Sequence, residues 1–235
     1  MSTNISWTDE TLNLLTGCTK VSDGCVNCYA EPTCNRMRLN PNAKVAHKFR
    51  NGFKLTEHPQ HLSDPVLRGK PKRIFLNSLS DTFHKDVSDG FLDATFDMIT
   101  QYPQHIFQVL TKRPEGFSRI QTWPRNVWLG VTMESEKYLS RLEILKKQDA
   151  AVRFASLEPL LGPIPVDAIK GLDWLIVGGE SGPKARPMDL KWAIEIREAC
   201  RRYGVPLWFK QVGGKDRQKG GSLLEGKEHH EYPIL

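Results

Sequence analysis

Cysteines are the residues best suited to chemistry in this chain of 235 residues. Three of its five cysteines, Cys18, Cys25 and Cys28, lie within residues 16–31, TGCTKVSDGCVNCYAE, in the spacing C-x6-C-x2-C. The first residues, MSTNISWTDE, have neither the basic nor the apolar region of a signal peptide. We therefore expect a reducing compartment, in which clustered cysteines bind metal rather than form disulfides. Cysteine thiolates hold iron–sulfur clusters, and three of them leave one iron of a 4Fe–4S cluster open.

The candidates for a fourth ligand decide between such a cluster and zinc, because a structural zinc site takes four protein ligands. They are Cys34, His47 and His84. On a helix over residues 28–38, Cys34 would face away from Cys28, because six residues do not return to the same side. The spacing therefore favours three cysteine ligands and an open iron. Zinc and incidental cysteines remain as alternatives.

Apolar runs along the chain predict the elements that must position these residues. Continuous runs rich in Val, Ile, Leu, Phe and Trp fit strands buried on both faces, as in parallel sheets. The six runs begin at Arg73, His105, Asn126, Val152, Asp173 and Val205. Amphipathic patterns between them predict helices over 89–101, 134–148 and 189–203. The last helix carries Cys200 on its apolar face, which indicates a core residue.

Strands that alternate with helices indicate right-handed βαβ units. The sequence therefore predicts an α/β fold with mostly parallel strands, arranged as a partial or full (β/α) barrel. We expect one domain over residues 1–235, with an irregular insertion at about 40–70 and a polar tail from about 214. No window approaches the roughly 18 apolar residues of a membrane span, so we expect a cytoplasmic protein without a membrane partner.

Polar residues where the predicted strands end form the candidate cofactor-binding set, because functional groups collect at the C-terminal ends of strands in (β/α) barrels. The set is Ser78, Asp81, Lys112, Thr132, Glu134, Ser156, Glu158, Gly179, Glu180 and Ser181. Lys112, beside Arg113, suits a carboxylate or a phosphate. Glu158 suits ribose hydroxyls or an amine, and the glycines around Glu180 in GGESG allow close approach of a ligand to the backbone. No residue is assigned a catalytic role.

Six motifs carry a resemblance that covers most of residues 7–214: TGCTKVSDGCVNCYAE, SLSDTFH, LTKRPE, GVTMES, SLEPLLGP and VGGESG. Together they resemble the phage Gp37/Gp68 family, which is radical-SAM-like. A three-cysteine loop followed by βα repeats is similar to the radical S-adenosylmethionine (SAM) enzymes. Their common motif is C-x3-C-x2-C with an aromatic residue before the last cysteine. Here the first gap is six residues, and the aromatic Tyr29 follows Cys28.

The resemblance implies a TIM-barrel-like enzyme that binds a 4Fe–4S cluster through Cys18, Cys25 and Cys28 and cleaves SAM reductively. It also implies an electron donor, and it leaves room for a protein partner. The GGE of GGESG is similar to the segment with which radical SAM enzymes bind the amine of SAM. A phage setting favours a nucleotide or nucleic acid as substrate. The net charge of +6 and the pI of about 9.1 are compatible with that substrate.

Two other classes of protein stay open on the residues alone. The basic pI and the tryptophans also fit a nucleic-acid-binding protein with a structural zinc. An iron–sulfur protein without SAM chemistry would need the cysteines but not a cavity lined by polar strand ends. Stoichiometric zinc after anaerobic purification would indicate the former, and a cluster that does not cleave SAM would indicate the latter.

Overall fold

The computed structural model describes residues 3–215 and 220–234, and the chain divides into two compact units. Unit 1 comprises Met1–Val21, Cys28–Trp128 and Asp149–Ala151. Unit 2 comprises Ser22–Asn27, Leu129–Gln148 and Val152–Leu235. The segment with the three cysteines thus contributes Cys18 and Cys28 to unit 1 and Cys25 to unit 2. The prediction of a single domain stays a prediction.

Among the described residues, one seven-stranded sheet has the strand order β1-β4-β5-β6-β7-β8-β9. The strands are β1 (Glu10–Leu12), β4 (Arg73–Leu76), β5 (Ile106–Thr111), β6 (Val127–Thr132), β7 (Val152–Leu157), β8 (Trp174–Gly178) and β9 (Leu207–Gln211). The pairs β1–β4, β4–β5, β7–β8 and β8–β9 are parallel. Each of the six predicted apolar runs contains a strand of this sheet, and β1 precedes them. With β1 and β9 at its two edges, the sheet is a partial barrel, and the predicted α/β fold class is confirmed.

Helices connect the strands, as the alternating pattern predicts. The α-helices are α1 (Ala30–Arg38), α2 (Ala43–Lys48), α3 (Asp89–Gln101), α4 (Leu139–Lys146) and α5 (Leu190–Tyr203). Short 3-10 turns lie at Asp23–Cys25, Pro59–Ser63, Pro65–Arg68, Pro114–Arg119, Glu136–Tyr138 and Val166–Ile169. Helix α3 has the predicted bounds, and α5 begins one residue later than predicted. Helix α4 is shorter than its pattern, because a 3-10 turn takes up the start of that segment.

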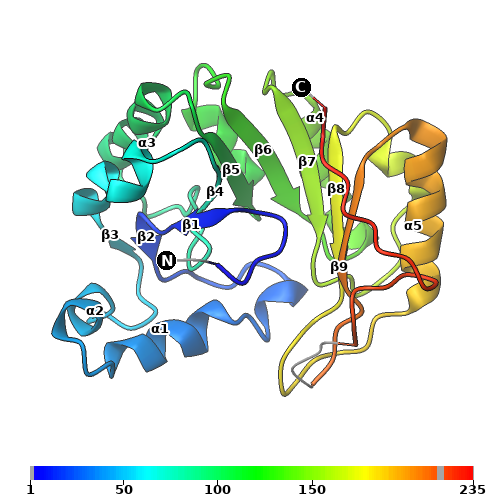
Figure 1. Cartoon of the computed structure of the whole chain (residues 1–235), viewed down its shortest axis with the longest axis horizontal. Helices are drawn as coiled ribbons and strands as arrows, with labels where there is room; N and C mark the ends of the chain where they lie inside the picture. The colour runs from blue at the N-terminus through cyan, green and yellow to red at the C-terminus, as the bar shows by residue number, and fades with distance from the viewer. Residues whose placement is uncertain (1–2, 216–219, 235) are drawn as a thin grey trace. The chain divides into compact units, whose positions relative to one another are not determined.

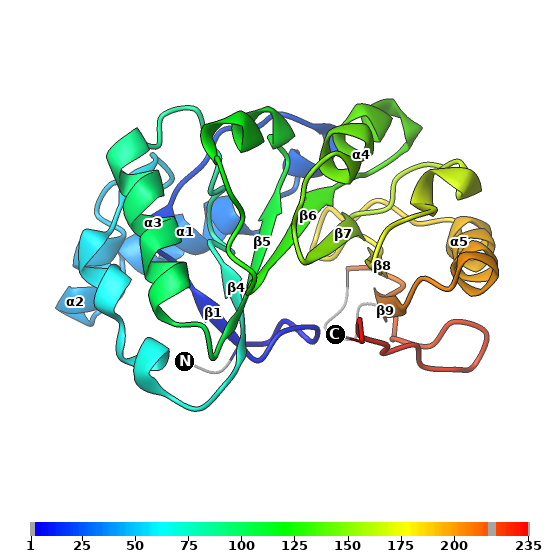
Figure 2. The same ribbon diagram turned by 90° about the horizontal axis from the view of Figure 1, so that it is seen from above.

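In unit 1, α3 is positioned by its cap and its apolar face. The Ser88 side chain accepts a hydrogen bond from the backbone N–H of Phe91, which caps the helix. Phe91, Leu92, Phe96 and Ile99 are buried at helical spacing. Helix α3 packs against the turn Pro59–Ser63, and Figure 2 shows this turn beside it. The segment between β4 and α3 is therefore fixed at both ends, and it includes the candidate site residues Ser78 and Asp81.

The insertion predicted at about 40–70 is in part regular. It contains α2, which packs against α1, and the strand β3 (Thr56–Glu57). Strand β3 pairs antiparallel with β2 (Leu15–Thr16), which directly precedes Cys18. Gly17 has φ +82, and a Cβ there would lie 2.2 Å from the carbonyl oxygen of Lys54, so only glycine fits this close approach. The insertion therefore supports the start of the cysteine segment.

In unit 2, α5 lies beside β8 and β9, as Figure 1 shows. Asp189 caps its N-terminus by accepting a hydrogen bond from Lys191 N–H, and Gly204 ends it with φ 67, both as the sequence predicts. The C-terminal segment runs along β9 and exchanges backbone hydrogen bonds with it at His229 and Glu231. The predicted polar tail from about 214 therefore pairs with the sheet over part of its length, and residues 216–219 lie outside the described residues.

A search of the described residues for helices that could span a membrane finds none with the necessary length and apolar character.

Candidate functional site

None of the three clustered cysteines forms a disulfide, and the three differ in burial. Cys18 and Cys28 are half-buried, whereas Cys25 is buried at the end of the turn Asp23–Cys25. Among the residues that the structure describes, no three His, Cys, Asp or Glu side chains lie close enough to hold a metal ion. The donor types nevertheless fit an iron–sulfur cluster, because three thiols on one short segment have no disulfide partner.

In unit 1, an arginine contacts the first of these thiols. Nη1 of Arg113 lies 3.5 Å from Sγ of Cys18, and Nη2 donates to the carbonyl and to the hydroxyl of Thr19, each at 2.8 Å. Behind the guanidinium lies Asp81, whose Oδ2 is 3.2 Å from Nη1. The side chain of Arg113 is only 6% exposed and that of Asp81 7%, so this ion pair is strong and little screened.

Asp81 is itself held by the end of the neighbouring strand. Its carboxylate accepts hydrogen bonds from the hydroxyl of Thr111 at 2.6 Å and from the backbone N–H of Lys112 at 3.0 Å. The backbone N–H of Phe83 also donates to this carboxylate at 3.0 Å, so with Arg113 it has four donors that fix its position. Of the predicted residues, Asp81 therefore takes part in the arrangement through its side chain, and Lys112 does so through its backbone.

The groups around Cys18 shift the pKa of its thiol in opposite directions. Burial raises the pKa of the Cys18 thiol, and the negative charge of Asp81 adds to this effect, while Arg113 opposes both. The net result is a pKa above the ordinary thiol value. Bound metal deprotonates a coordinating thiol outright, and a guanidinium contact then stabilises the thiolate. The arrangement is suited to a metal-bound thiolate rather than to a free nucleophile.

Two further contacts tie the cysteine segment to unit 1. The hydroxyl of Thr19 is 2.9 Å from Nε2 of His84, and the hydroxyl of Tyr29 donates to the carbonyl of Ser78 at 2.7 Å. Burial lowers the pKa of His84, and Arg113 lowers it further. The predicted residue Ser78 thus contacts the residue that follows Cys28.

In unit 2, a buried glutamate holds the residues just before Cys25. Oε1 of Glu134 accepts a hydrogen bond from the hydroxyl of Ser22 at 2.6 Å, and Oε2 lies 3.1 Å from Nη1 of Arg141. The side chain of Glu134 is fully buried and that of Arg141 is 8% exposed. The Ser22 hydroxyl is also 3.5 Å from Sγ of Cys25. Glu134, predicted as a cofactor ligand, therefore already has protein partners on both oxygens.

A second glutamate holds the other end of the same stretch. Oε2 of Glu180 accepts a hydrogen bond from Nδ2 of Asn27 at 3.0 Å, and Nη2 of Arg186 lies 2.5 Å from Oε1. Arg186 also donates to the carbonyl of Asp23 at 2.9 Å. Burial alone would raise the pKa of Glu180, but the hydrogen bonds from Arg186 and Asn27 outweigh it and hold the pKa below its usual value. The carboxylate is therefore ionised at neutral pH.

A third polar cluster in unit 2 joins the ends of β7 and β9. Lys210 Nζ lies 2.8 Å from Oε1 of Glu158, and the hydroxyl of Ser156 donates to Oε2 at 3.1 Å. A Cβ on Gly178 would lie 2.9 Å from the same carboxylate, so glycine allows the close approach. The predicted residues Ser156 and Glu158 are therefore brought together, and Lys210 joins them.

The remaining predicted residues are Thr132, Gly179 and Ser181, and none of them forms an ion pair with its side chain. The carbonyl of Thr132 accepts a hydrogen bond from Arg141 at 2.8 Å. Gly179 approaches the carbonyl oxygen of Val212 so closely that a Cβ would lie 1.8 Å away. The Ser181 hydroxyl is buried without a hydrogen-bond partner among the described residues. Ser78, Asp81 and Lys112 belong to unit 1 and the other seven predicted residues to unit 2.

Sequence reasoning missed the partners of the two glutamates. Arg141 lies on the short helix α4 and Arg186 lies in the loop before α5, so neither stands out in the sequence. Ser22 and Asn27 are ordinary loop residues by type. Only their position between the cysteines was a signal, because a loop that positions a ligand needs anchors of its own.

The other two cysteines are core residues. Cys34, on α1, is fully buried, and burial together with the neighbouring Cys28 raises its pKa. The thiols of Cys28 and Cys34 are thus within electrostatic range of each other. Cys28 precedes α1, so the helical spacing from which we expected Cys34 to face away from it does not apply. Cys200 is buried on α5, as predicted, and burial raises its pKa to about 12.

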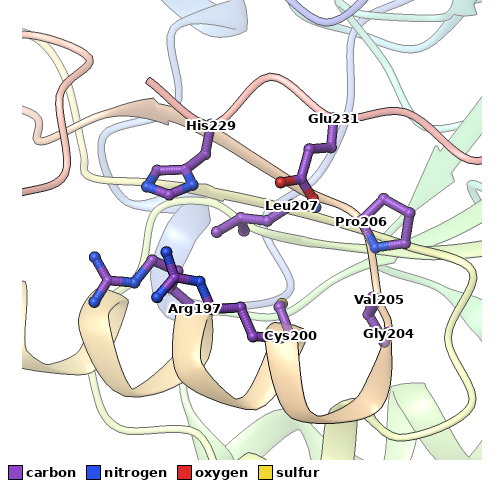
Figure 3. A pocket seen from close by; sticks show the side chains of 9 residues that line it. Arg197, Cys200, Gly204, Val205, Pro206, Leu207, His229 and Glu231 are labelled. Carbon is purple, nitrogen blue, oxygen red and sulfur yellow. Dashed lines mark hydrogen bonds between the residues drawn. The ribbon is translucent and has the colours of Figure 1, made fainter. Parts of the chain in front are cut away.

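Each unit contains a hollow among its described residues. A groove of about 760 Å³ in unit 1 is lined in part by Thr19, Phe83, Arg113 and Arg119. A smaller hollow of about 250 Å³ in unit 2 lies between α5 and the C-terminal segment, where His229 lies across from Arg197 (Figure 3). None of the predicted site residues lines either hollow, but the first is lined by Thr19 and Arg113, which belong to the contacts around Cys18.

Comparison with known proteins places the chain in a family. The family model described as "Protein of unknown function (DUF5131)" matches residues 2–233, so the chain belongs to this family. The phage-family name indicated by the motifs stays a prediction. No curated protein matches the chain.

Two solved structures match the chain. Spore photoproduct lyase complexed with dinucleoside spore photoproduct matches with a TM-score of 0.56 at 10% identity, over 88% of this chain and 77% of that one. A mutant of the same lyase with bound AdoMet and dinucleoside spore photoproduct matches with a TM-score of 0.45 at 10% identity, over 82% and 61%. At this identity, the first likeness shows a shared fold.

Proposed function

We propose that this protein is a radical SAM enzyme that holds a 4Fe–4S cluster through Cys18, Cys25 and Cys28. The observation that carries the proposal is the set of three cysteines on one short segment, none of them in a disulfide, in a chain with a partial-barrel fold. Three ligands leave one iron open for SAM, and Cys34, which is fully buried on α1, serves as the control cysteine. When bound, the cluster supplies the electron for reductive cleavage of SAM.

The residues around Cys18 then have a defined role. The guanidinium of Arg113 offsets the negative charge of the Cys18 thiolate at 3.5 Å. Asp81 holds Arg113 in place, and the strand end at Thr111 holds Asp81. Because the pair of Arg113 and Asp81 is buried, it excludes water from that side of the thiolate, while the charge of Asp81 offsets part of the effect of Arg113.

The groove in unit 1 is our proposed location for part of SAM or of the substrate. Its volume of about 760 Å³ falls within the range of small-molecule sites. Thr19 and Arg113 belong both to the groove and to the contacts of Cys18. Lys112 and the strand-end residues of unit 2, above all Ser156 and Glu158, are our further proposed contacts to SAM.

We propose a nucleotide or nucleic acid as the substrate and expect an external electron donor. The net charge of +6 and the pI of about 9.1 favour a polyanionic partner. The lyase with the similar fold was solved with a dinucleoside photoproduct, which is a ligand of this chemical class. A protein partner stays a prediction.

Anaerobic reconstitution tests the proposal. The intact protein should bind about four irons and four sulfides per chain, and reduction with SAM should release 5′-deoxyadenosine, measured by mass spectrometry. Cys18→Ala, Cys25→Ala and Cys28→Ala should each lose most of the iron, whereas Cys34→Ala should retain it. Protein that binds stoichiometric zinc and no iron under these conditions would refute the proposal and favour a zinc protein.

A further inference from the structure

Residues 22–27 are held at both ends by buried carboxylates. At the first end, Glu134 accepts the hydroxyl of Ser22 at 2.6 Å, and Arg141 is paired with the other carboxylate oxygen at 3.1 Å. All of these residues belong to unit 2. A charge-assisted hydrogen bond to a fully buried carboxylate is stronger than a surface contact, so Ser22 is held firmly.

At the second end, Glu180 accepts the amide of Asn27 at 3.0 Å. Arg186 pairs with Glu180 and also donates to the carbonyl of Asp23 at 2.9 Å, so one guanidinium bridges the glutamate and the loop backbone. The Asn27 amide donates in addition to the carbonyl of Lys184 at 3.0 Å. The turn that contains Cys25 therefore lies between two fixed points.

Gly24 adds a steric requirement between these points. A Cβ at this position would lie 2.4 Å from Oε1 of Glu134 and 2.8 Å from its Cγ, far inside van der Waals distance. The loop backbone thus lies directly on the glutamate, and glycine is the residue that permits this approach. Ser22 and Gly24 occupy one contact surface on the same carboxylate.

We propose that Glu134 and Glu180 are positioning residues that hold Cys25 through residues 22–27, rather than residues that contact SAM. This inference rests on the proposed cluster site for the role of Cys25, but the loop contacts stand without it. The anchor residues Ser22 and Gly24 lie within the three residues directly before Cys25, so the contacts act on the backbone that carries this thiol.

The thiol of Cys25 in the full chain without a cluster provides the first test. Iodoacetamide labelling, resolved by peptide mass spectrometry, reports how often this buried thiol opens. Ser22→Ala and Asn27→Ala should each raise the labelling rate of Cys25 by about tenfold, since each loses a hydrogen bond to a carboxylate. Labelling of Cys18 should not change. Ser118→Ala is the matched control, because its hydroxyl contacts only the carbonyl of Glu115.

A steric variant gives an independent measurement. Gly24→Ala should raise Cys25 labelling at least as much as Ser22→Ala, because the loop must move off Glu134. Gly90→Ala is the control, since a Cβ there meets nothing within 4 Å. These variants leave the pairing of Glu134 with Arg141 in place, so the protein should keep its thermal unfolding temperature to within a few degrees.

Reconstituted protein separates positioning from SAM binding. Glu180→Gln should alter the electron paramagnetic resonance spectrum of the reduced cluster and leave the affinity for SAM within about threefold. Unchanged cluster spectra together with a loss of SAM affinity of more than about tenfold would overturn the positioning role of Glu180.

The outcomes distinguish the two proposals. Unchanged Cys25 labelling in Ser22→Ala, Asn27→Ala and Gly24→Ala would overturn the anchoring inference, whatever iron the protein binds. Raised labelling in protein that never binds iron would support the anchor and refute the cluster.

Discussion

The two units use the same pair of residue types, a carboxylate and an arginine, in opposite order. In unit 1 the arginine faces the cysteine segment, with Asp81 behind Arg113. In unit 2 the carboxylate faces it, with Arg141 behind Glu134. The order decides the role, because a guanidinium stabilises a thiolate, whereas a carboxylate accepts hydrogen bonds from loop hydroxyls and amides.

The comparison separates a residue that acts on a thiol through its charge, Arg113, from one that anchors a loop, Glu134. Arg113 contacts a sulfur atom, so its loss should change the chemistry of Cys18 as well as stability. Glu134 contacts Ser22 and the backbone around Gly24, so its loss should first change loop conformation. Variants that break one arrangement and leave the other intact test whether these two roles are distinct.

The largest effect is expected when the buried guanidinium of unit 1 is removed. Arg113→Met leaves Asp81 buried with no countercharge, which should lower the free energy of unfolding by about 3–5 kcal/mol. Urea denaturation measures the loss. Arg119→Met is the control, since its partner Asp89 is 86% exposed, and it should change stability by less than about 1 kcal/mol. Equal effects of both variants would contradict a buried ion pair at Arg113.

Acid should destabilise unit 1 through a buried histidine. Burial lowers the pKa of His58 from 6.5 to about 4. Its Nε2 lies 2.8 Å from the hydroxyl of Thr16. Because the unfolded chain binds the proton more tightly, the stability contributed by neutral His58 is fully present above about pH 6.5. The free energy of unfolding then falls by about 2–3 kcal/mol as the pH drops toward 4. Thermal unfolding of His58→Gln against pH should lose this slope. A variant that keeps the full slope would exclude His58 as its source.

In unit 2, the two glutamates should differ in their contribution to stability. Glu180→Gln should lower the free energy of unfolding by about 1–2 kcal/mol, because Arg186 is 34% exposed and water replaces part of the lost contact. Glu134→Gln should lower it more, because Arg141 is then left buried without a countercharge. Urea denaturation of both variants gives the order, and the reverse order would contradict the burial argument.

The smallest effect is expected at the hydroxyl of Tyr29, which follows Cys28. Tyr29→Phe loses the hydrogen bond to the carbonyl of Ser78 at 2.7 Å, and the ring is exposed. The expected loss is about 0.5–1 kcal/mol. A loss above about 2 kcal/mol would mean that this contact anchors the segment as firmly as Glu134 does.

Much of the fold could be predicted because local pattern and tertiary role agree. The run from Val127 is buried at every position of β6, and α3 has the bounds of its amphipathic pattern. Continuous burial and a 3.6-residue period can both be recognised in a short window of sequence. The β2–β3 pair could not be predicted in this way, because each strand is two residues long and they pair across about forty residues of chain.

For the candidate site, the sequence predicts residue types but not which residues form ion pairs with one another. The strand-end positions include the carboxylates Asp81, Glu134 and Glu158, but the sequence does not indicate which arginine or lysine pairs with each. Arg141 and Arg186 became visible only through distances. Each pair depends on side-chain directions set by packing, which no local pattern encodes.

The sequence by itself determined the three-thiol segment, the parallel strands and the helices that connect them, because spacing and hydrophobic period act over a few residues. Only the tertiary structure decided which side of each ion pair faces the cysteines. That choice turns one buried pair toward a sulfur atom and another toward a loop, and it arises from contacts between residues as distant in the chain as Ser22 and Glu134.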